Sequence, residues 1–143
     1  MISVQETRDI ATCRALRRMV FIEEQGVSEA DEIDDLDDVA VHLLAQWHGD
    51  HVGTARLLVQ GHAGKIGRVC VRADLRGRGI GAALTHAAVA RFAAMDGVEK
   101  IKLSAQISAL AFYEKLGFVA YGPVYLDAGI DHRDMQLLLK PRP

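Results

Sequence analysis

The apolar residues of this chain alternate between strand-like runs, in which every second position is apolar, and helical runs with a spacing of three or four. Runs typical of strands occupy residues 2–4, 41–47, 52–58, 65–71, 100–105, 119–125 and 134–139. Helical spacing follows Thr7, an expected N-cap, and returns along a stripe from Ile80 to Met95. The order β-α-α-β-β-β-α-β-α-β-β predicts an α/β (α+β) fold, a mixed sheet with helices on its faces.

Two further helical segments are bounded by recognisable start and stop residues. Gly26 is typical of a stop for the early helices, whose arginines Arg14, Arg17 and Arg18 we expect on the solvent-exposed face. Near the C-terminus, Ser108 can cap a short helix that Gly117 ends in a left-handed conformation. That geometry would turn Phe118 back towards Tyr113.

The stretch from Val69 to Leu84 combines an apolar strand, a turn with two arginines and three alternating glycines, and an alanine-rich helix. A helix N-terminus offers unpaired N–H groups and a dipole that favours an anion. Because glycines let a phosphate approach the main chain closely, and Arg76 and Arg78 suit a diphosphate, the stretch predicts a phosphate-bearing ligand. A plain tight turn is the competing interpretation. The spacing fits neither the dinucleotide fingerprint nor the P-loop signature.

Residues 31–38 form a dense acidic block, Asp-Glu-Ile-Asp-Asp-Leu-Asp-Asp. A solvated loop is one interpretation of such a run, and a negative mouth that attracts a cationic amine is the other. The pattern alone favours neither interpretation over the other.

Composition and charge narrow the class of protein. The 143 residues fit one domain, half of them are hydrophobic, and the net charge is −2. This balance argues against nucleic-acid binding, and no apolar run approaches a membrane span. The two cysteines, Cys13 and Cys70, are expected to be buried thiols of a reducing compartment, so we expect a cytoplasmic protein without a membrane partner.

Two motifs, in this order, resemble the GNAT N-acetyltransferase superfamily. Arg76-x-x-Gly79-x-Gly81 resembles its Q/R-x-x-G-x-G/A signature, and the segment from Ala109 to Phe118 resembles its A-x-x-F-Y-x-x-x-G-F segment. The segment Val20–Gln25 and the acidic block resemble an ElaA-like or YjcF-like bacterial branch. The resemblance implies one acetyltransferase domain over residues 1–143, with a twisted, mainly antiparallel sheet of about seven strands.

The resemblance also implies acetyl-CoA as co-substrate, with no metal, and direct attack of an amine on the thioester. The diphosphate would lie on the glycine turn, and the pantetheine would lie between the preceding strand and the strand after the helix. Strand N–H groups would polarise the thioester carbonyl. The cofactor-binding residues implied are Val69, Cys70, Val71, Arg76, Gly77, Arg78, Gly79, Ile80, Gly81 and Gln106. Many relatives have Asn where this chain has Gln106.

Two catalytic roles follow from the resemblance. Tyr113 would be the general acid that protonates the departing sulfur, although its apolar neighbours also suit a core aromatic. The general base is open, because the strand from Lys65 to Val71 has no carboxylate. Glu24 ranks first, since it would line the acceptor cleft; the other candidates are Glu23, Asp37, His42 and His132.

The acceptor expected from this interpretation is a small-molecule amine or a peptide, and a homodimer is possible by resemblance. A non-catalytic acyl-CoA sensor is the alternative from another functional class, and it would make Tyr113 dispensable. An enzyme resembling acyl-homoserine-lactone synthases is a distant third option.

Overall fold

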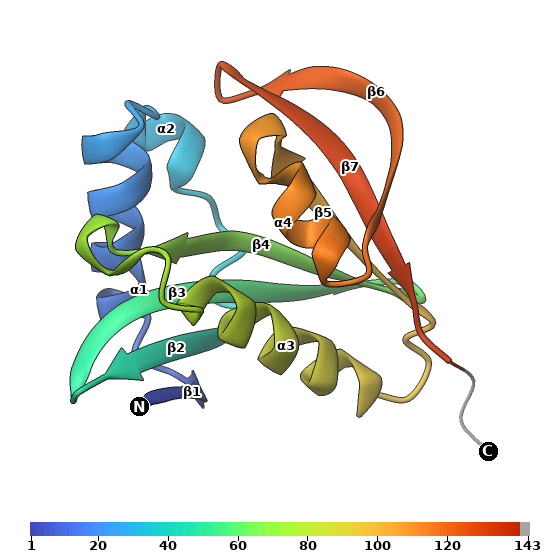
Figure 1. Cartoon of the computed structure of the whole chain (residues 1–143), viewed down its shortest axis with the longest axis horizontal. Coiled ribbons are helices and arrows are strands. Elements are labelled where there is room, and N and C mark those ends of the chain that lie inside the picture. Colours follow the sequence, from blue (N-terminus) through green and yellow to red (C-terminus); the bar gives the residue numbers. More distant parts are fainter. Residues whose placement is uncertain (141–143) are drawn as a thin grey trace.

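The strand-like runs form one mixed sheet in the computed structural model, which describes residues 1–140 (Figure 1). The strand order is β1-β2-β3-β4-β5-β7-β6, and all neighbours are antiparallel except β4 and β5. This sheet confirms the expected fold class. The strands are β1 (Ile2–Thr7), β2 (Val41–Trp47), β3 (Asp50–Gln60), β4 (Ala63–Val71), β5 (Lys100–Gln106), β6 (Val119–Asp127) and β7 (Ile130–Leu138).

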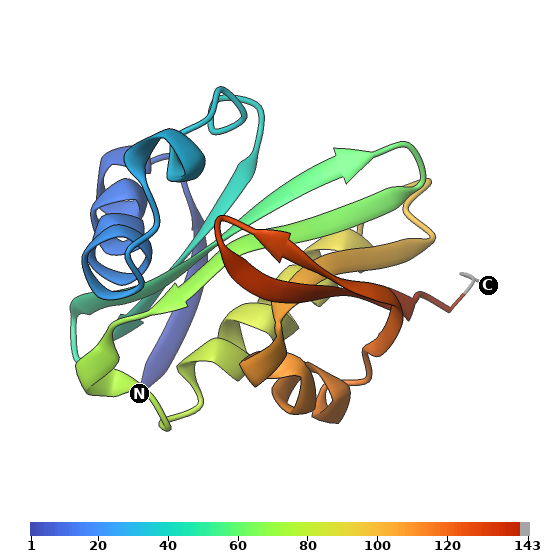
Figure 2. The ribbon, with the colours of Figure 1, turned by 90° about the horizontal axis from the view of Figure 1, so that it is seen from above.

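Helices cover both faces of the sheet (Figure 2). One face carries α1 (Ile10–Arg17), the π-helical segment η1 (Arg18–Glu24) and the single-turn α2 (Glu29–Glu32). The opposite face carries α3 (Ile80–Ala93) and α4 (Leu110–Lys115), and two short 3-10 turns, η2 (Ala73–Leu75) and η3 (Ile107–Ala109), precede them.

Two apolar clusters follow from this layering. The larger cluster lies between the sheet and the helices α3 and α4, and its centre includes Leu84 and Phe92. The smaller cluster lies under α1 and includes Cys13 and Cys70, which are both free thiols. Both cysteines are therefore buried, as expected.

The helix caps differ from the expected ones at two places. Asp9, rather than Thr7, caps α1 by accepting a hydrogen bond from the Thr12 N–H at 3.1 Å. Ser108 lies in η3, and no side chain caps α4, whose N-cap is Ala109. A 3-10 turn therefore fills the position that the expected cap would have occupied.

The other end of α4 agrees with the sequence. Gly117 is left-handed with a φ of 98°, and the Phe118 N–H donates to the Tyr113 carbonyl at 3.1 Å. The rings of Phe118 and Tyr113 meet edge to face, with centroids 6.0 Å apart. This contact confirms that Phe118 folds back onto α4.

Candidate active site

Strands β4 and β5 separate halfway along β4. Their parallel pairing joins residues 63–66 to residues 100–103 and then ends. Beyond that point β4 remains paired with β3 on its other side, through a bulge in which Arg68 and Val69 together oppose Ala55. Arg68 takes a left-handed φ of 52° in this bulge. The main chain of residues 67–71 therefore has no β5 neighbour, and an extended ligand could pair with it.

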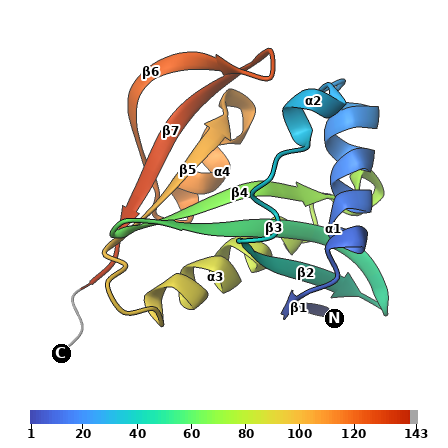
Figure 3. The same cartoon turned by 180° about the vertical axis from the view of Figure 1, so that it is seen from behind.

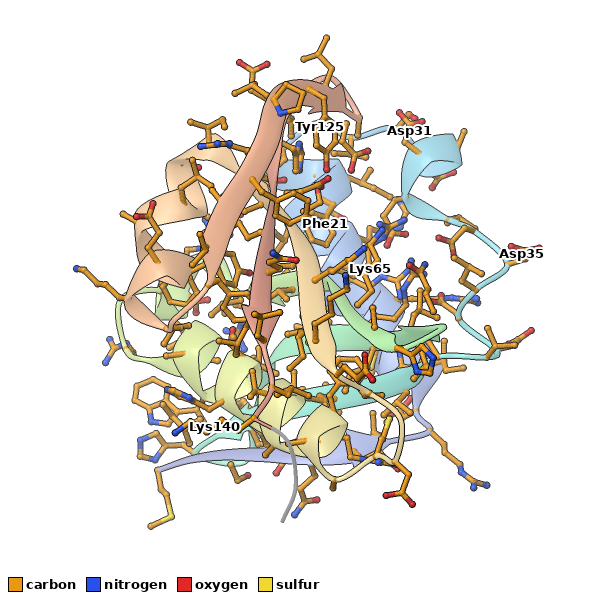
Figure 4. The ribbon with its side chains drawn as sticks, turned by 90° about the vertical axis from the view of Figure 1, so that its right-hand side faces the viewer. Phe21, Asp31, Asp35, Lys65, Tyr125 and Lys140 are labelled. Carbon is orange, nitrogen blue, oxygen red and sulfur yellow. The ribbon has the colours of Figure 1, made fainter. Side chains whose placement is uncertain are left out.

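A cavity of about 250 Å3 lies beside this separation. Figure 3 shows α2 and the β6–β7 hairpin on either side of the β4 ribbon, and residues of all three elements line the cavity. In Figure 4, Phe21 and Lys65 lie between β5 and the α2 segment that carries Asp31, whereas Asp35 points outward. The polar side chains of the lining are Gln25, Asp31, Glu32, Lys65, Arg68, Ser104, Gln106, Tyr113, Asp127 and His132.

Tyr113 belongs to both the apolar core and the cavity wall. Its side chain is 8% exposed, and burial alone raises the pKa of its hydroxyl to about 12. The hydroxyl therefore keeps its proton at neutral pH. Both interpretations of this residue, core aromatic and cavity-lining donor, describe its position.

Gln106 reaches the same cavity from the end of β5. Its Nε2 donates a hydrogen bond to Oε1 of Gln25, just beyond η1, at 2.9 Å. The two side-chain amides thereby fix each other's orientation across the cavity wall. The sequence pattern gave no sign of this partner, because 81 residues separate the two glutamines.

His132 of β7 is the base candidate that lines the cavity. Its Nδ1 lies 2.7 Å from the Ile130 carbonyl, which can only accept, so Nδ1 carries the proton of this bond. In the neutral imidazole, Nε2 is then left with a free lone pair. The ring also stacks on Tyr125, with centroids 6.3 Å apart.

Tyr125 is itself held by a short chain of hydroxyl and carboxylate groups. Its hydroxyl donates to Oδ1 of Asp134 at 2.6 Å and accepts a hydrogen bond from the Ser104 hydroxyl. Burial and the bond to Asp134 raise the pKa of Tyr125. The alternation of β7 places His132 and Asp134 on one face. The sequence pattern predicted this strand only from residue 134, so it placed His132 before the strand rather than in it.

The remaining base candidates do not line the cavity. Asp37 and His42 are buried in another part of the molecule, where His42 donates through Nε2 to the Asp37 carbonyl at 2.9 Å. Glu23 is exposed outside the cavity. Glu24 does not line the cavity either, contrary to the expectation that placed it in the acceptor cleft. The π-helical turn of η1 rotates it away, since the N–H of Gln25 bonds five residues back to Val20.

Glu24 instead forms a two-pronged ion pair with Arg76 in the glycine turn. The guanidinium nitrogens lie 2.5 and 2.6 Å from the two carboxylate oxygens, and this bond lowers the pKa of Glu24. The same guanidinium also donates twice to the Val71 carbonyl, at 3.2 Å. A carboxylate with a lowered pKa is a poor general base.

The glycine turn has an open backbone in front of helix α3. Gly77 and Gly79 are left-handed, with φ of 79° and 84°, and a Cβ on either would meet nothing within 4 Å. No side chain caps α3 at Gly79, so the N–H groups of its first turn have no capping side chain as a partner. Gly81 differs, because a Cβ there would come 3.3 Å from the Phe112 ring. Its small size therefore fits the packing of α4.

Arg78 has a different partner from Arg76. Its guanidinium lies 4.6 Å from the centroid of the Trp47 ring, at the end of β2. Both turn arginines thus contact partners within the protein.

The acidic block is neither a solvated loop nor a uniformly negative mouth. Arg17, only 1% exposed, donates to Glu32 at 2.5 Å and to Asp37 at 2.8 Å. Arg56 of β3 donates to Asp34 at 2.8 Å and to Asp37 at 3.1 Å. Arg17 was expected on the solvent-exposed face of α1, and this burial shows that the expectation was wrong. Three of the block's carboxylates are neutralised inside the protein.

Arg14 and Arg18 do lie near solvent, each with about half of its side chain exposed. Arg14 reaches Asp37 at 2.9 Å, and Arg18 pairs with Glu29. Within residues 1–140, no cluster of three or more His, Cys, Asp or Glu side chains is arranged to hold a metal ion. No helix in that range is long and apolar enough to cross a membrane.

Comparisons with known proteins agree with this geometry. Residues 20–139 match the family described as acetyltransferase (GNAT) domain. The chain is 35% identical over 121 residues to the uncharacterized N-acetyltransferase YjcF of Bacillus subtilis, covering 84% of this chain and 86% of that protein. Among solved structures, Escherichia coli ElaA has a TM-score of 0.83 at 27% identity, covering 95% and 99% of the two chains.

An acyl-CoA N-acyltransferase from Pseudomonas aeruginosa gives a TM-score of 0.81 at 30% identity, covering 95% of this chain and 97% of the other. Both solved structures therefore match the fold over 95% of this chain, and the family match covers residues 20–139.

Proposed function

Because this chain belongs to the GNAT family of N-acetyltransferases, we propose that it transfers acetyl from acetyl-CoA to a primary amine on a small molecule or peptide. One observation carries the proposal. The buried, protonated hydroxyl of Tyr113 and the imidazole of His132 line the same cavity, beside the unpaired edge of β4. We treat residues 1–143 as a single N-acetyltransferase domain.

The donor would bind along β4 and the glycine turn. The main chain of Val69, Cys70 and Val71 is free of β5 and suits the pantetheine amides, and Gln106 adds a side-chain amide. The N–H groups from Gly77 to Gly81, including that of Ile80, suit the diphosphate. Arg76 would exchange Glu24 for phosphate oxygens, and the Val71 carbonyl would then be released.

The reaction then needs two proton transfers within the cavity. The amine nitrogen attacks the thioester carbonyl carbon, and Nε2 of His132 takes a proton from that nitrogen, directly or through one water. An N–H of the β4 edge stabilises the oxygen of the tetrahedral intermediate. As the carbon–sulfur bond breaks, Tyr113 donates its proton to the sulfur. The products are the N-acetylated amine and CoA as a thiol.

Substitution of the two residues tests these roles separately. Tyr113→Phe should lower kcat by about 100-fold or more, because the thiolate then leaves without an acid. CoA affinity, measured by calorimetry, should remain unchanged. His132→Gln should lower turnover mainly below the pKa of the amine, so the pH profile of kcat/KM should change shape. Equal turnover of Tyr113→Phe and the parent would exclude the acid role, and CoA binding without turnover on a broad amine panel would favour the sensor.

A further inference from the structure

The cavity wall formed by β4 carries positive charge and no carboxylate. Ion pairs connect the guanidinium groups of Arg14, Arg17, Arg56 and Arg68 to the same three carboxylates, those of Glu32, Asp34 and Asp37. Each of these carboxylates is therefore shared by at least two arginines. Of these four arginines, only Arg68 lines the cavity.

Arg68 is held in place but is not saturated with partners. One terminal nitrogen, Nη2, donates to the Glu32 carbonyl at 3.1 Å and to Oδ2 of Asp34 at 3.3 Å. Its Nε is buried without a hydrogen-bond partner within residues 1–140, since the Glu32 carboxylate is 3.6 Å away. Burial and the nearby Arg56 lower the pKa of Arg68, which marks a cation with too little compensating negative charge.

Lys65 adds a second cation to the same wall. It is exposed, lines the cavity, and forms no ion pair with any residue in the part of the chain that the structure describes. It also lies in register with Lys102 of β5, so both side chains extend from the same face of the sheet. Like charges directly opposite each other repel, so Lys102 does not compensate the charge of Lys65, and of the two only Lys65 lines the cavity.

The carboxylates of the lining lie on other elements than the two cations. Glu32 is bonded to Arg17 at 2.5 Å, so its negative charge is already compensated. Asp31 of α2 and Asp127 at the end of β6 are exposed, as Lys65 is, and neither forms an ion pair with another described residue. The positive wall and the two exposed carboxylates therefore face one small cavity.

We propose that the acceptor amine carries a carboxylate, which Arg68 and Lys65 bind while the amine nitrogen reaches Tyr113 and His132. This inference rests on the proposed function and names its substrate class. Arg68 and Val69 share one step of the strand in the bulge, so the β4 main chain covers roughly 10 Å from Lys65 to Val69 at about 3.3 Å per step, and several bonds separate the two groups of the acceptor. A cavity of about 250 Å3 suits a molecule of amino-acid size.

Matched pairs of acceptors test the proposal. Each pair is an ω-amino acid and its primary amide, from glycine to 6-aminohexanoic acid, assayed with acetyl-CoA. The parent should prefer the acid by about 10-fold or more in kcat/KM at the best chain length, because a charge-assisted hydrogen bond is lost in the amide. Lys65→Met and Arg68→Lys should each lose most of this preference through KM for the acid.

Two measurements keep the test decisive. Lys140→Met changes the net charge equally but lies far from the cavity, at the lower end of Figure 4, and it should keep the preference. Equilibrium binding of the same acceptors to the protein saturated with CoA, measured by calorimetry, needs no turnover. Acid-selective binding without acetylation would keep this inference and overturn the proposed function. Acetylation that prefers amides or polyamines, or an unchanged preference in Lys65→Met, would overturn the inference alone.

Discussion

The glycine turn and the acidic block are both charged segments of similar length. The ion pair of the turn is exposed to solvent, whereas the central ion pair of the block is buried. In the turn, the pair of Arg76 and Glu24 leaves 42% and 38% of the two side chains exposed. In the block, the pair of Arg17 and Asp37 leaves 1% and 2%. The first pair is a surface contact, and the second is part of the interior.

This difference teaches which charges can change partners. An exposed ion pair contributes little free energy and is weakened by salt, so Arg76 can leave Glu24 for a phosphate. A buried pair cannot be separated without leaving an uncompensated charge in the interior. The turn can therefore bind and release a ligand, whereas the block fixes α1 and α2 on the sheet. Arg68 of β4 lies between these two cases, because it pairs with Glu32 and Asp34 of the block while 26% of its side chain is exposed.

The largest effect should come from breaking the buried pair. Asp37→Asn removes the charge that Arg14, Arg17 and Arg56 share, and it should lower the free energy of unfolding by about 3–5 kcal/mol. Urea denaturation followed by circular dichroism measures this change. A loss below about 1 kcal/mol would show that the block is as exchangeable as the turn.

Acid denaturation supplies the control for that variant. The arginines hold the pKa of Asp37 well below its unfolded value of 3.8, so its contribution is fully present above pH 4 and is lost as the pH falls below it. The parent should therefore lose stability below pH 4 more steeply than Asp37→Asn.

An intermediate effect is expected when the turn is filled. A Gly79→Glu side chain would enter the open space in front of α3, and it should weaken CoA binding by about 100-fold or more through bulk and negative charge. Calorimetric titration with CoA measures the affinity. Gly79→Ala is the control, because it introduces the same strain at the left-handed φ but adds no charge. Any loss of CoA affinity in this variant is caused by the backbone strain. Equal losses in both variants would contradict a phosphate site.

The smallest effect should come from releasing Arg76. Glu24→Gln removes the competing carboxylate, and it should tighten CoA binding by a few-fold at low salt, with the gain shrinking at high salt. Glu23→Gln, on the neighbouring exposed residue, makes the same change in charge and should leave the affinity unchanged. If Glu24→Gln instead abolished turnover at unchanged CoA affinity, Glu24 would act as the base.

Features fixed by neighbouring residues could be predicted from the sequence. The alternation of apolar residues located every strand, and the spacing around Gly79 and Gly117 located the turn before α3 and the end of α4. Each depends on backbone preferences within one turn or strand.

Features fixed by distant partners could not be predicted. The burial of Arg17 depends on Glu32 and Asp37, which are 15 and 20 residues away, and periodicity carries no information about such pairing. The position of Glu24 depends on a π-helical turn, and a helical wheel assumes α-helical geometry. His132 appeared only as one of five base candidates, because its position opposite Gln106 requires the pairing of β7 with β5.

The bulge at Arg68 also constrains how this strand can evolve. It shifts the alternation of β4 by one residue, so Lys65 and Cys70, an odd and an even position, both serve the face that α1 and α2 cover. Loss of Arg68 or Val69 would restore plain alternation and still leave Gly67 and Cys70 opposite Arg56 and Thr54, so the later half of the strand would keep its faces. The constraint therefore falls on the site and not on the sheet, because such a deletion would remove a residue of the cavity wall while the strand pairing survives.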